Sequence, residues 1–122
     1  MGHIYKYNCI CGYETEAHIG AGLQGVNLDL IGRYFPKDRE IIVSNRQDIK
    51  KFILKNALVK CDKCKKIFVL PCLEYEYNSE EIIKKGECPT CKGIVDICHD
   101  IDDVTCPKCN QFMIRELIGH WD

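Results

Sequence analysis

The sequence predicts an α+β fold built from two zinc ribbons, which are short antiparallel hairpins held by metal, with one or two inserted helices. The first observation is that ten of the 122 residues are cysteine and that eight of these form four close pairs. The second is that the other apolar residues would make only a modest core for this length. The third is that short alternating segments, typical of strands, flank the pairs. Paired cysteines in an intracellular chain indicate metal binding rather than disulfides.

Two alternating segments lie on either side of the first cysteine pair. Residues 3–8 are rich in aromatic side chains, and residues 13–19 alternate again, so both segments are expected to be strands. Residues 9–12 would then form the turn of a hairpin. Gly12 directly follows the second cysteine, at a position where a metal-binding turn favours a positive φ.

The next segment, residues 20–25, matches G-x-G-x-x-G, a fingerprint of dinucleotide-binding folds. A possible helix at 26–35 and a possible strand at 40–43 follow it. The strand before the glycines is half polar, whereas a dinucleotide-binding unit needs a buried apolar strand. The second strand ends in Ser44 and Asn45 rather than in an acidic residue. We therefore interpret the glycines as a flexible loop and expect no small-molecule cofactor.

The strongest helix signal covers residues 45–56. Ser44 and Gln47 resemble the N-cap and N3 positions of a capping box. Apolar residues follow at helical spacing. They are Ile49, Phe52, Ile53 and Ala57. Several lysines lie off that apolar face, which is typical of a solvated surface.

The remainder of the chain is expected to be mostly strand. Residues 65–77 alternate along their whole length. Pro71 within this segment implies an edge strand or a bulge, because proline cannot donate to a strand ladder. Residues 79–85 are expected to form one helical turn. Residues 94–97 and 112–116 are expected to be short strands.

The cysteine pairs have the spacing of zinc ligands. A C-x-x-C turn directs two thiolates at one point, and two such turns supply the four tetrahedral ligands of a structural zinc ion. The last two pairs are separated by 14 residues, and each has proline after its first cysteine, which is typical of a ribbon. We therefore expect two zinc ions. Site 1 would comprise Cys9, Cys11, Cys61 and Cys64, and site 2 would comprise Cys88, Cys91, Cys106 and Cys109.

A nested arrangement is the alternative to this sequential one. The inner pairs, with 23 residues between Cys64 and Cys88, could join each other and leave the outer pairs to close the chain ends. Loop-closure entropy depends too weakly on length to decide between the two. Each half of the chain contains a cysteine turn, a strand, a spacer, a second turn and a second strand, which favours sequential pairing. That pairing implies an N-terminal ribbon over residues 1–77, with a helical insertion at about 26–56, and a C-terminal ribbon over residues 78–122.

Two cysteines remain outside the pairs. Cys72 lies in an apolar strand and Cys98 ends one, so both are expected to pack as small apolar residues. The alternative is a thiol redox sensor or enzyme that uses either of them, with His99 beside Cys98. Neighbours on a strand point to opposite faces, which disfavours Cys98 and His99 as a nucleophile and its base. The four histidines lack the spacing of a catalytic zinc site, so no catalytic residue is expected.

Charge is distributed unevenly along the chain. The formal net charge is −1, but two zinc ions bound by eight thiolates would lower it to about −5. Residues 37–66 carry ten basic and four acidic side chains, whereas residues 67–122 carry five basic and eleven acidic ones. These opposite charges favour a protein partner. The alternative is nucleic-acid binding through the basic 46–66 segment. Its candidate contacts are Lys50, Lys51, Lys55, Lys60, Lys63, Lys65 and Lys66.

Two N-terminal segments resemble the start of a group of small bacterial zinc-ribbon proteins. They read Tyr5-Lys6-Tyr7-Asn8-Cys9-Ile10-Cys11-Gly12-Tyr13-Glu14 and Ile19-Gly20-Ala21-Gly22. That group typically has an aromatic strand, a C-x-x-C-G-Y-E turn, a glycine-rich loop and three more C-x-x-C pairs, and often ends like Trp121-Asp122. The Cys9–Cys11 turn is one residue shorter than the first turn of the group. The group is of uncharacterised function, so the resemblance implies zinc and a double-ribbon architecture without an activity.

We therefore expect a non-enzymatic, zinc-binding interaction module. Zinc would supply the folding energy that the small core lacks, so removing the metal should unfold the chain. The first residues lack the apolar core of a signal sequence, and no apolar run is long enough to span a membrane. A cytoplasmic protein without membrane contact is therefore expected.

Overall fold

The computed structural model describes residues 2–121, apart from the side chains of residues 23 and 24. Strands dominate, and two short helices and a 3-10 turn lie between the second and third strands. The elements are β1 (Gly2–Asn8), β2 (Glu14–Gly20), η1 (Leu23–Val26), α1 (Leu28–Tyr34), α2 (Pro36–Ser44), β3 (Phe52–Cys61), β4 (Lys66–Tyr77), β5 (Glu80–Lys85), β6 (Asp96–Ile97) and β7 (Ile114–Trp121). This arrangement confirms the predicted α+β class.

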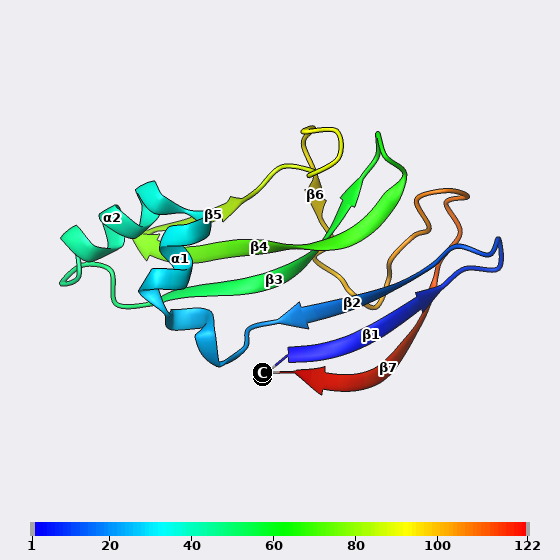
Figure 1. The fold of residues 1–122 in the computed structure, drawn as a ribbon, viewed down its shortest axis with the longest axis horizontal. Helices are drawn as coiled ribbons and strands as arrows, with labels where there is room; N and C mark the ends of the chain where they lie inside the picture. The colour runs from blue at the N-terminus through cyan, green and yellow to red at the C-terminus, as the bar shows by residue number, and fades with distance from the viewer. Residues whose placement is uncertain (1, 122) are drawn as a thin grey trace.

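The strands form one antiparallel sheet with the order β5-β4-β3-β2-β1-β7, and β6 pairs with β3 beside this path (Figure 1). Two halves of the sheet meet at a single pair, Gly20 opposite Asn56. We call β2, β1 and β7 the terminal half-sheet, because it contains the first and last strands. We call β3, β4, β5 and β6 the central half-sheet. Its longest ladder joins β3 to β4 along the whole of β3.

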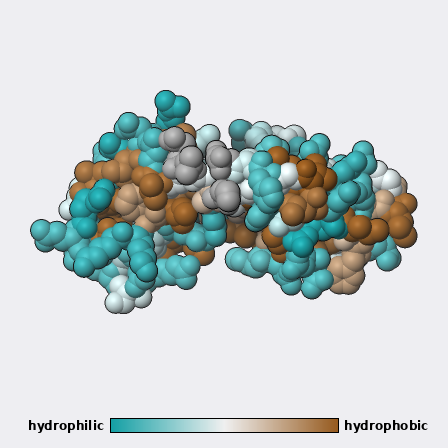
Figure 2. Space-filling view, turned by 90° about the horizontal axis from the view of Figure 1, so that it is seen from below, coloured by the Kyte–Doolittle hydropathy of each residue, from teal (hydrophilic) through white to brown (hydrophobic). Residues whose placement is uncertain are grey.

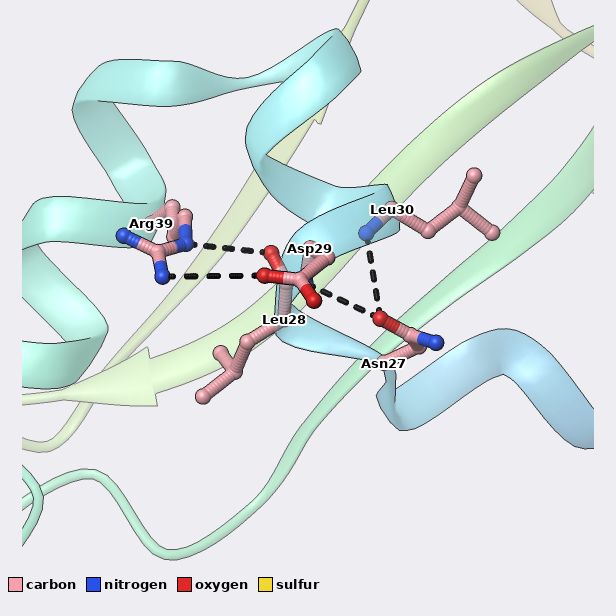
Figure 3. A network of polar contacts seen from close by, with 5 residues as sticks. All are labelled: Asn27, Leu28, Asp29, Leu30 and Arg39. Carbon is pink, nitrogen blue, oxygen red and sulfur yellow. Dashed lines mark hydrogen bonds and ion pairs between the residues drawn. The ribbon is translucent and has the colours of Figure 1, made fainter.

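A side-chain cap begins α1 (Figure 3). The Asn27 Oδ1 atom accepts hydrogen bonds from the backbone N–H groups of Asp29 and Leu30, at 2.9 and 3.2 Å. This cap satisfies N–H groups that a helix start leaves without intrahelical partners. Arg39 of α2 binds the same end of α1, because its Nε atom donates to the Leu28 carbonyl oxygen at 3.2 Å. The two helices are therefore fixed to each other, and α1 lies within the segment predicted to be helical.

Both helices cover one face of the central half-sheet (Figure 1). Ile31 of α1 and Ile42 of α2 are fully buried in a cluster with Leu54, Leu73 and Tyr75 of the sheet. Burial of such side chains is the main favourable contribution to folding. Among residues 2–121, no helix has both the length and the apolar character needed to cross a membrane.

A second buried cluster joins the two half-sheets. Tyr5 and Tyr7 of β1 and Ala17 of β2 pack with Leu58 of β3 and Ile67 of β4. None of these five residues is more than 8% exposed. The half-sheets therefore share this buried cluster, although their ladders meet at a single pair.

The helix predicted over residues 45–56 is wrong. Helix α2 ends at Ser44. There the Asn45 side chain donates a hydrogen bond from Nδ2 to the Ile41 carbonyl oxygen at 2.8 Å. The chain then turns and enters β3 at Phe52. β3 is buried on both faces near its middle, so its sequence shows an apolar run instead of the alternation of a half-buried strand. Its ladder with β4 overrides the local helical spacing.

Two further local predictions are also wrong. Residues 40–43 lie inside α2 instead of forming a strand. Residues 80–85 form strand β5, which pairs with β4, instead of a helical turn. Asn78 and Ser79 adopt positive φ angles of 54° and 62° in the two-residue turn that joins these strands. Such turns match the twist of paired strands and favour asparagine, which is the signal that the sequence analysis missed.

Other local predictions are confirmed. β1 and β2 form the expected N-terminal hairpin, and β4, β6 and β7 overlap the other predicted strands. Gly12 has the expected positive φ, at 98°. The ladder between β4 and β5 covers Cys72 to Tyr77 of β4. Pro71 lies one residue before it, at a local edge of the sheet, as expected for proline. The strands on either side of the glycine-rich segment, β2 and β3, are antiparallel, whereas a dinucleotide-binding unit needs parallel strands.

Candidate metal centres

Eight cysteines gather into two groups of four. In each group, all four Sγ atoms lie within 4.8 Å of one another. We call the first group the outer centre, and it comprises Cys9, Cys11, Cys106 and Cys109. We call the second group the inner centre, and it comprises Cys61, Cys64, Cys88 and Cys91. The eight residues are those that the spacing predicted as ligands.

The two centres are nested, so the sequential assignment of ligands to sites 1 and 2 is wrong. The outer centre combines the first and fourth cysteine pairs, and the inner centre combines the second and third. The reason is long-range strand pairing. β1 and β7 pair up to Asn8 opposite Ile114, which brings both ends of the chain to one place. β6 pairs beside the end of β3, with Ile97 opposite Val59, and the third cysteine pair packs in the buried cluster around Val59.

The expected boundary between residues 77 and 78 does not separate the two centres. The inner centre contains cysteines from both sides of this boundary, and so does the outer centre. The ladders between β4 and β5 and between β1 and β7 cross it as well. Each centre therefore links the two segments that were predicted to be separate ribbons.

All four cysteine turns share one backbone feature. The residue after the second cysteine has a positive φ in every turn. The angles are 98° at Gly12, 55° at Lys65, 60° at Lys92 and 64° at Asn110. Lysine adopts this region rarely, so at Lys65 and Lys92 the turn geometry outweighs local preference, whereas asparagine is enriched in this region. Gly12 carried the clearest local signal for this conformation, and Asn110 carried a weaker one.

The short Cys9–Cys11 turn keeps the backbone closure of a longer one. The Cys9 N–H donates to the Tyr13 carbonyl oxygen, and the Gly12 N–H donates back to the Cys9 carbonyl oxygen, both at 2.9 Å. The turn that starts at Cys106 is closed by a corresponding pair of hydrogen bonds, at 2.7 and 2.9 Å. The missing residue therefore shortens the turn without opening it.

Backbone N–H groups also surround the sulfur atoms. Cys61, Cys91 and Cys106 each accept a backbone N–H hydrogen bond on Sγ at 3.4 Å. Such bonds stabilise the thiolate, which is the form that binds metal. These bonds also orient the sulfur atoms within their turns.

The thiol pKa values within each centre differ widely. The backbone N–H of Cys91 makes the largest contribution at Cys88 and lowers its pKa to about 6. Burial raises the pKa of Cys106, but hydrogen bonds from the backbone N–H groups that follow it outweigh burial, and the pKa falls to about 7. The neighbouring Cys91 thiol raises the pKa of Cys64 to about 12. Four thiols so close together cannot all ionise unless a cation balances their charge, and a divalent metal ion would supply it.

The sulfur spacing fits a tetrahedral metal ion. A zinc–sulfur bond of about 2.3 Å places the four sulfurs about 3.8 Å apart. Four of the Sγ–Sγ distances are 3.3 Å for Cys9–Cys109, 3.7 Å for Cys11–Cys106, 3.6 Å for Cys61–Cys91 and 3.7 Å for Cys64–Cys88, and the others do not exceed 4.8 Å. Each centre could therefore hold one ion with four protein ligands.

The two centres differ in exposure. Cys11 of the outer centre is exposed, whereas every cysteine of the inner centre is buried or half-buried. The inner centre also packs against the apolar side chains of Val59 and Val95, both 0% exposed. Solvent and reagents therefore reach the outer centre more easily.

The two unpaired cysteines stand apart from both centres. Cys72 is 1% exposed and Cys98 is half-buried. They line, together with His99, a cavity of about 190 Å³. Burial raises the pKa of both thiols, which disfavours the reactive thiolate. This environment supports packing as small apolar residues over redox chemistry.

The lysines of the 46–66 segment do not gather into one patch. Lys50 and Lys51 precede β3, whereas Lys63 and Lys65 lie in the turn that follows it. β3 has ten residues, so about 33 Å of strand separates the two groups. This spread disfavours a continuous basic surface.

The other lysines of this segment already have partners. Lys55 forms an ion pair with Glu74 of β4 at 2.8 Å. The Nζ atoms of Lys60 and Lys66 donate to threonine hydroxyl groups at 3.3 and 2.8 Å. Part of the positive charge is thus satisfied within the molecule.

Comparisons with protein-family models, with curated proteins and with solved structures found no match. The fold and the site nevertheless define a class. The chain is a small α+β protein, mostly antiparallel sheet, with two four-cysteine groups that could bind metal ions. Thiolate tetrahedra of this kind are typical of zinc and of iron.

Proposed function

We propose that this chain is a zinc-binding scaffold. Two structural zinc ions, each held by four thiolates, would stabilise a surface that binds a protein partner, and the chain itself would catalyse no reaction. The observation that carries this proposal is the tetrahedral spacing of four sulfurs in each centre. Cys9 and Cys109 are 100 residues apart in sequence, yet their sulfurs are 3.3 Å apart. An ion at the outer centre would therefore cross-link the two ends of the fold.

The number of ligands supports a structural role. A catalytic zinc ion keeps one coordination position for water or substrate, whereas four thiolates fill a tetrahedral ion completely. Each centre offers four sulfurs, and each joins segments that are distant in sequence. Zinc bound in this way contributes directly to folding free energy, which suits a chain with a small core.

Native mass spectrometry with quantified metal tests the zinc assignment. We expect two zinc ions per chain and two thiols, Cys72 and Cys98, that remain free. A strong chelator should then abolish the cooperative thermal transition and change the circular dichroism spectrum. One zinc ion per chain, another metal, or an unchanged transition after metal removal would contradict the proposal.

The uncovered face of the terminal half-sheet supports a protein partner. Residues directly opposite in an antiparallel ladder share a face. Glu16, Lys6 and Glu116 lie side by side across the three strands, and Glu14 and Ile114 lie on the same face. The other face of β1 and β2 packs in the core through Tyr5, Tyr7 and Ala17. The charged side chains named here are three carboxylates and one lysine, so this face has a net negative charge, which suits a partner with basic side chains.

Exposed apolar side chains lie next to the outer centre. Ile10 is 88% exposed between two cysteine ligands, Phe112 is 70% exposed after the last ligand, and Ile114 is 66% exposed at the start of β7. Figure 2 shows hydrophobic side chains at the surface of both halves of the molecule, among hydrophilic ones. Single exposed apolar residues are common, but several beside the two turns of one metal centre suit an interaction surface.

Affinity capture with quantitative mass spectrometry tests this surface. We expect one basic protein to be enriched by the unchanged chain and lost with the double variant Phe112→Ser, Ile114→Ser. The matched control is Ile83→Ser, because Ile83 is also an exposed apolar residue, 41% exposed, but lies on β5. Equal capture by the double variant and the control would contradict this surface.

Nucleic-acid binding is the second candidate, and one contact favours it. The Nζ atom of Lys66 lies 5.7 Å from the centre of the Phe68 ring, next to the inner centre. Aromatic and basic side chains together are typical of single-strand recognition. Titration with single-stranded and duplex oligonucleotides at about 50 mM salt tests it. If binding depends on salt and is weakened in the variant Lys63→Ala, Lys65→Ala, the result would favour nucleic acid over a protein as the partner.

A further inference from the structure

His3 and His120 face each other across the first and last strands. They lie directly opposite in the β1–β7 ladder, although 117 positions separate them in sequence. Their Nδ1 atoms are 3.0 Å apart, and their ring planes are inclined at 63°. Both side chains are exposed, and neither belongs to a cysteine centre.

Hydrogen bonding alone gives this pair little stability. Two neutral imidazoles can share one hydrogen bond, in which the Nδ1–H of one ring donates to the Nδ1 atom of the other. At an exposed position that bond competes with water, so its net contribution is small. Within residues 2–121, neither ring forms an ion pair with a carboxylate. The His3 ring also lies 5.8 Å from the Tyr5 ring, between centroids, and the exposed position of both histidines lets their rings turn toward a ligand.

The distance between the two nitrogens fits a shared metal ion. Imidazole nitrogen binds zinc at about 2.0–2.1 Å. Two nitrogens bound to one ion are then about 2.9 Å apart at right angles and about 3.3 Å apart in a tetrahedron. The separation of 3.0 Å between His3 and His120 falls between these values. The exposed rings would turn so that both lone pairs point at one ion, which would take the place of the hydrogen bond between them.

We propose that His3 and His120 form a two-imidazole site for a borderline divalent metal ion, separate from the two cysteine centres. Imidazole suits Zn²⁺, Ni²⁺ and Cu²⁺, and Cu²⁺ binds most tightly in this series. Water would complete the coordination. The proton that one Nδ1 atom carries in the hydrogen-bonded pair would move, through solvent, to Nε2 of the same ring. Both Nδ1 lone pairs then face the metal, with no net loss of a proton.

Metal at this site would link the first strand to the last. The unfolded chain does not hold the two histidines together, because 117 positions separate them. The ion would therefore bind the folded state preferentially and stabilise it by mass action. The ion would stabilise the fold by joining β1 to β7, and no thiolate would take part in binding it.

The test measures the binding of the untagged, zinc-loaded protein to immobilised Ni²⁺ that has two adjacent free coordination positions. Ni²⁺ is preferred to Cu²⁺ because Cu²⁺ has a high affinity for thiolates and would compete at the cysteine centres. His3→Ala and His120→Ala should each weaken binding by about tenfold or more, because each variant turns a two-point contact into a single one. His18→Ala is the matched control, since His18 is an exposed histidine on β2 outside the pair, and it should bind like the original protein.

Two comparisons would overturn the site. If His18→Ala weakens nickel binding as much as His3→Ala does, independent surface histidines account for the binding. If the double variant His3→Ala, His120→Ala is much weaker than either single variant, the two rings act separately instead of as one site. Soluble Ni²⁺ should also raise the Tm of the original protein and leave that of His120→Ala unchanged. An equal rise in both proteins would likewise contradict the proposal, and each variant should retain its zinc content.

Discussion

The Tyr13 hydroxyl oxygen accepts a hydrogen bond from the Ile67 backbone N–H at 2.9 Å, and this bond ties the hairpin of the outer centre to the strand that leaves the inner centre. The Tyr13 carbonyl also closes the turn of Cys9. Ile67 follows the turn of Cys64 by three residues and is 2% exposed. The two half-sheets share one ladder pair and one buried cluster, and this hydrogen bond adds a further direct link close to both centres.

Tyr13→Phe should destabilise the fold by about 1 kcal/mol, because it removes the acceptor of the Ile67 N–H and keeps the ring. The measurement is urea unfolding of the zinc-loaded protein. Tyr34→Phe is the matched control, since Tyr34 is 54% exposed, and its free energy of unfolding should not change. Equal effects of the two variants would show that the link contributes nothing specific.

Double substitutions distinguish nested from sequential metal binding. Cys9→Ala together with Cys109→Ala removes two ligands of the same centre, so one zinc ion per chain should remain. Cys9→Ala together with Cys61→Ala removes one ligand from each centre and should weaken the binding of both zinc ions. Sequential pairing predicts the opposite pattern. Native mass spectrometry at matched free zinc gives the stoichiometry, and Cys72→Ala, which should keep both ions, is the control.

The outer centre should react first with thiol reagents. Cys11 is its exposed ligand, whereas every cysteine of the inner centre is buried or half-buried. Limited alkylation of the zinc-loaded protein, followed by peptide mapping, should find label at Cys11 before Cys61 or Cys88. A chelator should likewise release zinc in two phases. Earlier labelling of the inner cysteines would contradict the difference in exposure.

Gly12→Ala should destabilise the protein by about 1–2 kcal/mol through the backbone alone. Gly12 has a φ of 98°, and an added Cβ would meet nothing within 4 Å, so the cost comes from conformation and not from crowding. Gly86→Ala is the matched control, because its added Cβ also meets nothing and its backbone is not in the left-handed region. Similar losses of stability in both variants would rule out this explanation.

Two tyrosines should make the fold sensitive to alkali. Burial raises the pKa of Tyr7 to about 12, and burial followed by the hydrogen bond to Asp38 raises the pKa of Tyr75 to about 12. An unfolded tyrosine has a pKa of about 10. Because folding raises these pKa values, the stability that the two neutral tyrosines contribute is fully present below about pH 10 and is lost as the pH rises toward 12. Tyr75→Phe should flatten the fall in unfolding free energy over that interval, and an unchanged slope would contradict the assignment.

Local signals identified the parts of this protein whose structure is decided by neighbouring residues. Cysteine spacing identified the eight residues of the two centres, because a metal-binding turn is only a few residues long. Gly12 indicated the positive φ of its turn because glycine accepts that conformation without strain. Alternation likewise located β1, β2 and β4.

Other features depended on contacts between distant segments. The helical spacing after Ser44 gave no sign that β3 would form a ladder with β4, and burial on both faces removed the alternation that would have revealed a strand. The turn at Asn78 and Ser79 did carry a local signal, but pairing with β4 decided that the next residues form a strand.

The sequence by itself determined that four cysteine turns exist, and only the tertiary structure decided which of them share a centre. Closing a loop costs nearly the same entropy for nested and sequential pairs, so chain length does not choose between them. The choice is made by the β1–β7 ladder, which brings Cys9 to Cys109, and by the pairing of β6 with β3, which accompanies the approach of Cys88 to Cys64. Strand pairing over such distances is set by burial and register across the whole sheet, and no short segment of sequence contains that information.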